Sequence, residues 1–272
     1  MERIVYFKDY QIKEEYYSKK EIGFRIFLKI SICASLILGM IYFLISHDYN
    51  VGVALSYYEF DLAIINLIIL MFGLIFNVVF LVNKKFENPK LYYLFKLIFT
   101  VNHIIMSLLY LFLVMPTIIA TKHFDYINII ICIFLYVLPS ILLAFDFIRF
   151  DYNYRSKRYY SYLSIFPFFI YYLIVLFISK FSDITWQSYG IGFESIKMPY
   201  VYLDYNFINV VNNDYSLYNI QTGVMGMSTI FLLFWIFVAL VGLSLILLHF
   251  KNKTMIKVYK IPYTANNVHQ DI

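Results

Sequence analysis

The sequence predicts an all-α integral membrane protein built as a bundle of six transmembrane helices. Hydrophobic residues make up 62% of the 272 residues and charged residues only 14%, whereas a soluble domain has roughly 45–50% apolar and about 25% charged residues. The chain also contains six apolar runs of the roughly 20 residues that a helix needs to cross a bilayer. Because lipid offers no hydrogen-bond partners to an open sheet edge, we expect these runs to be helices.

The apolar runs divide the chain into a membrane domain and its polar extensions. The membrane domain covers residues 26–249, with spans at about 26–46, 61–82, 92–115, 127–148, 161–180 and 227–249. Residues 1–25 form an N-terminal segment, 250–272 form a tail, and 181–226 form one long connection between the last two spans. The first span lacks a small-residue cleavage site, so we expect an anchor and not a removed signal peptide.

Basic residues indicate how the bundle is oriented. They gather in the N-terminal segment, in the second-to-third and fourth-to-fifth connections, and in the tail, at Arg3, Lys8, Lys13, Lys19, Lys20, Arg25, Lys84, Lys85, Lys90, Arg149, Arg155, Lys157, Arg158, Lys251, Lys253, Lys257 and Lys260. The other side has Lys122, Lys180 and Lys197. Since cytoplasmic loops are enriched in lysine and arginine, we expect a multi-pass cell-membrane protein with both termini in the cytoplasm.

The 181–226 connection is rich in aromatic residues, namely Trp186, Tyr189, Phe193, Tyr200, Tyr202, Tyr205, Phe207, Tyr215 and Tyr218. Loops longer than about 12–15 residues are usually functional or disordered, and this composition disfavours disorder. We expect the connection to fold over the outer mouth of the bundle. It would act there either as a lid or as an aromatic cap that ties the helices together.

No cofactor and no metal site are expected. Cys33 and Cys132 each lie in an apolar run, which excludes a disulfide framework and a cysteine-based zinc cluster. The sequence contains no phosphate-binding glycine loop and no nucleophile-elbow or zinc-protease motif. Nucleic acid is not an expected partner, because the net charge of +5 lies on one side of a bilayer. Membrane lipid is the expected partner, and the oligomeric state is left open.

Polar residues inside the predicted spans form the candidate site, because a polar group in hydrocarbon is costly. In the second span Asn66 and Asn77 are eleven residues apart, which at about 100° per residue places them on one face together with Gly73. Asp61 lies at the outer end of this span. The pattern fits either hydrogen bonds between helices, with close packing at the glycine, or a ligand-binding face.

The third span has one polar face from end to end, formed by Lys96, His103, Ser107 and Tyr110, with Asn102 beside it. His103 lies near the middle of the bilayer. It is a candidate general base, because histidine titrates near neutral pH. The alternative is a neutral, hydrogen-bonded histidine of the core.

The fourth span contains Asp146 a few residues from its inner end, at a depth that matches Lys96 in the third span. An ion pair would relieve the desolvation cost of both groups, so we expect a structural Lys96–Asp146 pair, with Arg149 as the competing partner. The double substitution Lys96→Met with Asp146→Leu would then be better tolerated than either change alone.

These polar residues together predict a central cavity that opens toward the outer face beneath the 181–226 connection. We expect four of them to bind a ligand: Asn66, Asn102, His103 and Asp146. Tyr136 in the fourth span is a further lining residue.

Five short motifs follow one another along the chain. They are residues 57–60 (Tyr-Tyr-Glu-Phe), 100–103 (Thr-Val-Asn-His), 138–146 (a proline and leucine run that ends in Asp), 164–167 (Ser-Ile-Phe-Pro) and 199–204 (Pro-Tyr-Val-Tyr-Leu-Asp). With these motifs in this order, residues 55–249 resemble the six-span Pr6Pr group of bacterial membrane proteins. That group is related to the androgen-induced-gene family (the FAR-17a/AIG1-like proteins). The resemblance implies a bacterial protein, and the 28 tyrosines and 28 phenylalanines against two tryptophans indicate an AT-rich genome.

The resemblance also implies a chemistry that this chain lacks in part. Animal members of the family are regarded as intramembrane hydrolases of lipid esters, with a threonine nucleophile in the second span and a histidine in the fourth. The matching positions here fall at Leu62 or Ala63 and at Leu135. The animal mechanism therefore does not transfer directly.

Three functions are compatible with these observations. The first is a membrane protein without enzymatic activity that binds a lipid or amphiphile in the polar cavity. The second is an unorthodox hydrolase that uses His103 as base with Ser107, Thr100 or Cys132 as nucleophile. The third is a small-solute transporter, which is weaker because the chain lacks internal repeats and shows no clear broken helices.

Overall fold

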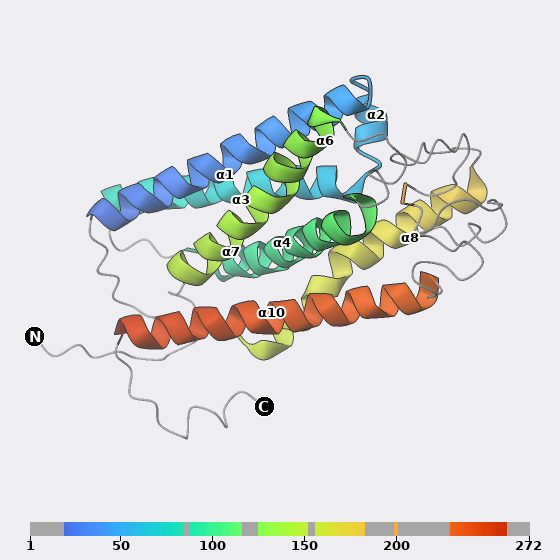
Figure 1. Ribbon diagram of the computed structural model, residues 1–272. Coiled ribbons are helices and arrows are strands. Elements are labelled where there is room, and N and C mark those ends of the chain that lie inside the picture. The colour runs from blue at the N-terminus through green and yellow to red at the C-terminus, as the bar shows by residue number, and fades with distance from the viewer. Residues whose placement is uncertain are drawn as a thin grey trace, which may run out of the picture.

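The structure, a computed structural model, describes residues 19–83, 88–115, 125–151, 156–182, 199–200 and 229–259. Within these ranges the regular elements are all helical. Six helical segments are long and apolar enough to cross a membrane, at Glu21–Ser46, Tyr58–Val82, Lys90–Val114, Tyr126–Phe150, Arg158–Phe181 and Phe231–Thr254. They confirm the predicted all-helical architecture with six segments of membrane-spanning length (Figure 1).

Several of these segments combine different helix types. The elements are α1 (Lys19–Ser46), α2 (Val51–Ala54), α3 (Tyr58–Val82), α4 (Lys90–Leu109), the π-helical η1 (Tyr110–Val114), α6 (Tyr126–Ile131), the π-helical η2 (Cys132–Val137), α7 (Leu138–Phe150), the 3-10 helix η3 (Arg158–Ser164), α8 (Ile165–Phe181) and α10 (Thr229–Tyr259). Pro139 is the second residue of α7, two positions after η2 ends at Val137. Proline has no backbone N–H, so the carbonyl four residues before it, in η2, loses its usual α-helical hydrogen bond. The wider π-helical turn lies in the stretch where this bond is missing.

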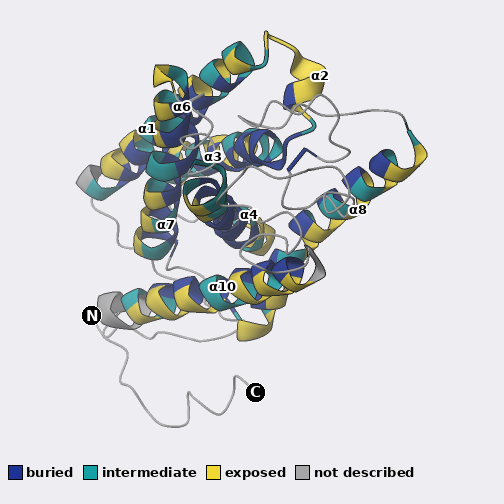
Figure 2. Ribbon diagram, turned by 45° about the vertical axis from the view of Figure 1, so that its right-hand side comes forward, coloured by how far each residue is buried: buried dark blue, intermediate teal, exposed yellow. Residues whose placement is uncertain are grey.

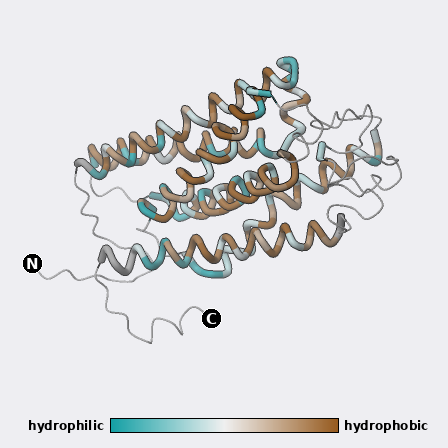
Figure 3. The backbone as a smooth tube through the Cα atoms, viewed as in Figure 1, coloured by the Kyte–Doolittle hydropathy of each residue, from teal (hydrophilic) through white to brown (hydrophobic). Residues whose placement is uncertain are grey.

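The two ends of the bundle differ in charge. At the end that we call the basic end, α1 and α4 begin and α3, α7 and α10 finish, and it lies to the left in Figure 1. Described basic residues near this end include Arg25, Lys90, Arg149, Lys251 and Lys253. The opposite end holds α2 and the starts of α3 and α6. Figure 3 shows hydrophobic residues along the helices and hydrophilic ones gathered toward their ends, as a bilayer requires.

The central helix of the bundle is α4. Its segment is the most deeply buried of the six, and it contacts α3, α7, α8, α10 and η3. Figure 2 shows that many buried residues of the surrounding helices face inward while many exposed ones face outward. Side chains on the inner face of α4 are therefore removed from both water and lipid.

Gly39 lets α1 approach the fourth segment closely. A Cβ atom at this position would lie 2.7 Å from both the Cα and the backbone nitrogen of Leu135 in η2. Backbone atoms cannot swing away as a flexible side chain can, so only glycine fits this contact. Small residues at helix crossings serve the same purpose in many membrane proteins.

We predict that Gly39→Ala destabilises the bundle, by about 1–3 kcal/mol, the usual cost of overpacking. Gly23→Ala is the matched control, because a Cβ at position 23 meets nothing within 4 Å and because alanine has a higher helix propensity than glycine. Thermal unfolding of both variants in detergent provides the comparison. Equal unfolding temperatures for the two variants would contradict the close contact between α1 and η2.

Candidate functional site

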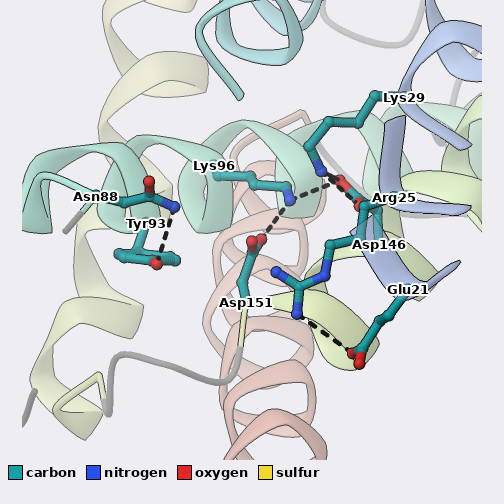
Figure 4. A network of polar contacts seen from close by, with 8 residues as sticks. All are labelled: Glu21, Arg25, Lys29, Asn88, Tyr93, Lys96, Asp146 and Asp151. Carbon is teal, nitrogen blue, oxygen red and sulfur yellow. Dashed lines mark hydrogen bonds and ion pairs between the residues drawn. The ribbon is translucent and has the colours of Figure 1, made fainter. Parts of the chain in front are cut away.

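Four buried charged residues meet near the basic end and form what we call the ionic cluster: Lys29, Lys96, Asp146 and Asp151 (Figure 4). The Lys29 ammonium lies 2.6 and 2.7 Å from the two carboxylate oxygens of Asp146. Lys96 lies 2.6 Å from Asp146 Oδ2 and also pairs with Asp151. The cluster therefore runs as a chain, Lys29–Asp146–Lys96–Asp151, that joins α1, α4 and the end of α7.

Two further cations lie beside the ionic cluster. Lys251 of α10 is fully buried, donates to Ser156 Oγ at 3.0 Å and interacts electrostatically with Asp151. Arg25 of α1 lies 3.5 Å from Glu21 and stacks over the ring of Phe150 at 5.1 Å. Both of these cations are thus held by partners within the protein.

The structure brings together Lys96 and Asp146, the pair expected from their matching depths. Arg149, the alternative partner, is exposed and forms no ion pair with a described residue. Lys29 and Asp151 were not predicted. Lys29 is the single charged residue within 26–46, so the depth argument used for Lys96 could have found it, whereas Asp151 follows the end of the span.

The middle of the bundle contains hydrogen-bonded polar groups. The Asn102 amide donates to the carbonyls of Ile98 and Ser164, both at 2.8 Å, and its oxygen accepts from the Tyr58 hydroxyl at 2.8 Å. The Asn66 amide donates to the carbonyl of Leu62 one turn earlier, at 2.9 Å. Asn102 therefore connects α4 to α3 and η3, and its amide group is fully used.

Two serines connect the third and fourth segments. The Ser107 hydroxyl donates to the carbonyl of Tyr136 at 2.7 Å and lies 2.5 Å from the Ser140 hydroxyl. Both serines are buried. The Ser140 hydroxyl also lies 3.5 Å from the backbone carbonyl of His103, so this is a packing contact between α4 and the fourth segment that involves the backbone of His103 and not its ring.

His103 is almost completely buried on the inner face of α4. Its imidazole lies against the backbone of Leu135, whose carbonyl cannot receive the usual helical bond four residues on, because Pro139 has no N–H. The contact falls short of hydrogen-bond geometry, and at least one ring nitrogen has no partner among the described residues. No described hydroxyl or thiol is hydrogen-bonded to the ring.

The Glu59 carboxyl lies in the half of the bundle opposite the ionic cluster, where it belongs to a second set of buried polar side chains. Its Oε1 accepts from the Tyr136 hydroxyl at 2.7 Å, and its Oε2 has no described partner. The Tyr110 ring stacks on the Tyr136 ring at 3.9 Å and 15°, and the Tyr110 hydroxyl also has no described partner. Glu59 and Tyr110 are only 3% and 2% exposed, so bulk water does not reach them.

Aromatic side chains surround the start of α3 at this end. Tyr200, from the long connection, accepts a hydrogen bond from the backbone N–H of Tyr58 at 2.9 Å and packs against Tyr57 and Tyr171. His47 packs against Tyr57 with 5.0 Å between ring centroids. The connection thus contributes a buried tyrosine to the bundle, and residues 183–198 and 201–226 lie outside the described ranges.

The four predicted ligand residues have different surroundings. Asp146 belongs to the ionic cluster, Asn102 is saturated by three partners, and Asn66 bonds within its own helix. His103 alone retains a nitrogen without a described partner. The central cavity that these residues would line stays a prediction.

Several buried residues keep a polar atom without a described partner, and four of them lie along α4 and η1 or close to Tyr110. We call these four the unpartnered group: Glu59 (Oε2), Thr100 (Oγ1), His103 (a ring nitrogen) and Tyr110 (the hydroxyl). Three of them lie on the same face of α4 and η1 as Lys96 and Ser107, at spacings of three and four residues. Of these four residues only His103 was among the predicted ligand residues. A polar ligand would find both donors and acceptors here.

The described residues contain no cluster of three or more histidine, cysteine or acidic side chains suited to a metal ion. Comparisons with known proteins found no match to this chain among protein-family models, curated proteins or solved structures. The resemblance to the Pr6Pr group stays a prediction.

The linear order of the ionic cluster predicts which double substitution is tolerated. Asp146→Leu leaves Lys29 without a carboxylate partner, and breaking a buried pair costs about 3–5 kcal/mol. Lys29→Met with Asp146→Leu removes one terminal pair and leaves Lys96 with Asp151, so it should be more stable than the single variant. This double variant should also be more stable than Lys96→Met with Asp146→Leu, in which Lys29 still has no carboxylate partner. Thermal unfolding in detergent ranks the three, and the reverse order of the two doubles would refute the linear arrangement.

A pH dependence follows from His47, which lies just beyond the end of the first span. Burial lowers the pKa of His47 below its usual value, although its hydrogen bond to the Phe43 carbonyl opposes this. The folded protein then binds fewer protons than the unfolded chain, so stability is lost as the pH falls below about 6.5. We expect His47→Gln to flatten the fall in unfolding temperature between about pH 7 and about pH 5. The exposed His249→Gln is the control, and equal slopes in the two variants would contradict this assignment.

Proposed function

We propose that the protein is a multi-pass membrane protein whose basic end faces the cytoplasm, with both termini on that side. The support is the distribution of charge among the described residues. Lysine and arginine gather at the basic end, whereas the opposite end holds acidic residues, Asp48, Glu59, Asp61 and Asp125, and only Lys180 as a basic residue. Lysine and arginine favour the cytoplasmic side of a membrane.

We further propose that the bundle binds the polar head of a lipid or other membrane amphiphile at the unpartnered group. The observation that supports this most is that Glu59, Thr100, His103 and Tyr110 each keep a buried polar atom without a described partner. Buried polar atoms in proteins are nearly always hydrogen-bonded, and leaving one unpaired costs about 1–3 kcal/mol. A polar group from outside the chain would supply the missing bonds.

The ligand role moves away from two of the residues first considered. Asp146 is already neutralised by two lysines, and the Asn102 amide makes three hydrogen bonds. Either would have to break existing contacts to receive a ligand. His103 keeps its proposed role, and Asn66 stays a candidate on the facing helix.

Hydrolysis of a lipid ester is less well supported. The imidazole of His103 does lie against the backbone of Leu135, the position where the family resemblance would place a histidine. A general base, however, must reach a nucleophile within hydrogen-bonding distance, and His103 has no such hydroxyl or thiol among the described residues. Leu62 and Ala63, where the family nucleophile would fall, are fully buried apolar residues.

Transfer of a proton or small solute through the bundle is the second candidate. The observation in its favour is the inner face of α4 and η1, where Lys96, Thr100, His103, Ser107 and Tyr110 form one continuous buried polar stripe. Buried titratable chains mark proton and ion pathways in membrane proteins. Proteoliposomes that contain a trapped pH-sensitive dye would reveal such transfer.

Photocrosslinking tests the binding proposal. The protein is reconstituted with a phosphatidylcholine that carries a diazirine close to its headgroup, irradiated, and mapped by peptide mass spectrometry. We expect adducts on peptides of α3, α4 and η2 that are reduced at least several-fold in His103→Leu. The exposed His249→Leu receives the same chemical change outside the site and should label like the wild type.

Adducts confined to exposed residues, or adducts that His103→Leu leaves unchanged, would reject binding at the unpartnered group. A fluorophosphonate probe applied to the same preparations separates binding from hydrolysis, and we expect no adduct. A fluorophosphonate adduct that is lost in His103→Leu would instead establish an activated nucleophile and favour the hydrolase.

A further inference from the structure

The described residues contain three buried acidic side chains, which differ in whether they pair with a lysine. Asp146 and Asp151 each pair with lysine in the ionic cluster. Glu59 is as deeply buried as these two, at 3% exposed, yet it forms no ion pair with a described lysine or arginine. Among the described residues, two of these carboxyls therefore have lysine counter-ions and the third has none.

The described groups that interact with the Glu59 carboxyl are tyrosine hydroxyls and a second carboxyl, that of Asp61. Tyr136 of η2 donates to Oε1, and the phenols of Tyr57, Tyr110 and Tyr171 all interact electrostatically with this carboxyl.

The other described charged or titratable groups that interact with this aromatic cluster do not supply a cation either. Asp61, two residues on along α3, adds a like charge. Asp125, at the start of α6, and Cys132 of η2 interact with Tyr110. Directly after α1, His47 packs on Tyr57, and burial lowers the pKa of His47 below its usual value, so it is neutral at neutral pH.

An ionised carboxylate in such a place would cost several kcal/mol even after relaxation, whereas a neutral acid with hydrogen bonds costs far less. We propose that Glu59 is a proton-binding site of the bundle and carries an exchangeable proton on Oε2. The proton changes Oε2 from an acceptor without a partner into a donor. Tyr110, stacked on Tyr136 and also without a described partner, offers an acceptor in the same cluster.

The proton on Glu59 would be coupled to the fourth segment through Tyr136. The hydroxyl of Tyr136 bonds Glu59, and its carbonyl accepts from Ser107. Tyr136 lies in η2 and Tyr110 opens η1, and π-helical turns are frequent at functional sites. Loss of the proton would place a negative charge on Glu59, next to Tyr136 of η2 and Tyr110 of η1. This inference is independent of whether a lipid binds.

Infrared spectroscopy of the reconstituted protein tests the proposal directly. We expect a carboxylic-acid C=O band at neutral pH that disappears reversibly as the pH is raised. Glu59→Gln should remove the band and Asp146→Asn should keep it, because Asp146 is ionised by its two lysines. A wild-type protein without the band, or a band that survives in Glu59→Gln, would overturn the proposal.

Stability gives a second, independent readout. Glutamine reproduces the shape and donor of a protonated glutamate, so Glu59→Gln should unfold at nearly the wild-type temperature at neutral pH. Asp146→Asn removes a charge that two lysines require, and its unfolding temperature should drop clearly. If Glu59→Gln drops as far as Asp146→Asn, or fails to accumulate, Glu59 is ionised and its partner is a cation, which contradicts a bound proton.

Discussion

The structure depends first on the pairing of Asp146 with Lys29 and Lys96. All three side chains are withdrawn from solvent, with Asp146 fully buried, so each charge needs its partner at close range. Because the partners come from α1, α4 and α7, the pairing fixes the relative depth of three helices. Once α4 is held at that depth, the rest of its polar face must lie opposite η2, and this places His103 beside Leu135 and Tyr110 beside Tyr136.

Much of this arrangement could be predicted from sequence, because the governing rules are local. Apolar runs of bilayer length gave six helices, and the depths of Lys96 and Asp146 along their spans brought these two side chains together. The partners of Asp146 could only partly be predicted. Arg149 lies only three residues after Asp146 in α7, but its side chain is exposed and does not pair with Asp146. Lys29, in contrast, pairs with Asp146 from another helix. Sequence distance is a poor guide where helices pack side by side.

Glu59 shows why other parts of the site could not be predicted. At the first turn of a span an acidic residue ordinarily faces water, and nothing in residues 57–60 indicates otherwise. Its burial depends on Tyr136, which reaches it from a different segment, and on the aromatic cluster that Tyr200 joins from far along the chain. The π-helical turns are likewise a result of packing, apart from the hint given by Pro139. A pattern along one helix does not contain these long-range contacts.

The two halves of the bundle therefore keep polar groups in an apolar environment by different means. Near the basic end, the buried carboxylates Asp146 and Asp151 are each neutralised by lysine, so a ligand could enter the ionic cluster only by breaking pairs whose loss costs several kcal/mol. In the other half, hydroxyls and one carboxyl make single hydrogen bonds and leave neighbouring atoms without a described partner. Such a group gains bonds when a proton or polar ligand arrives and loses none. The chemistry of this protein is accordingly expected around Glu59 and His103, while the ionic cluster holds the helices that position them.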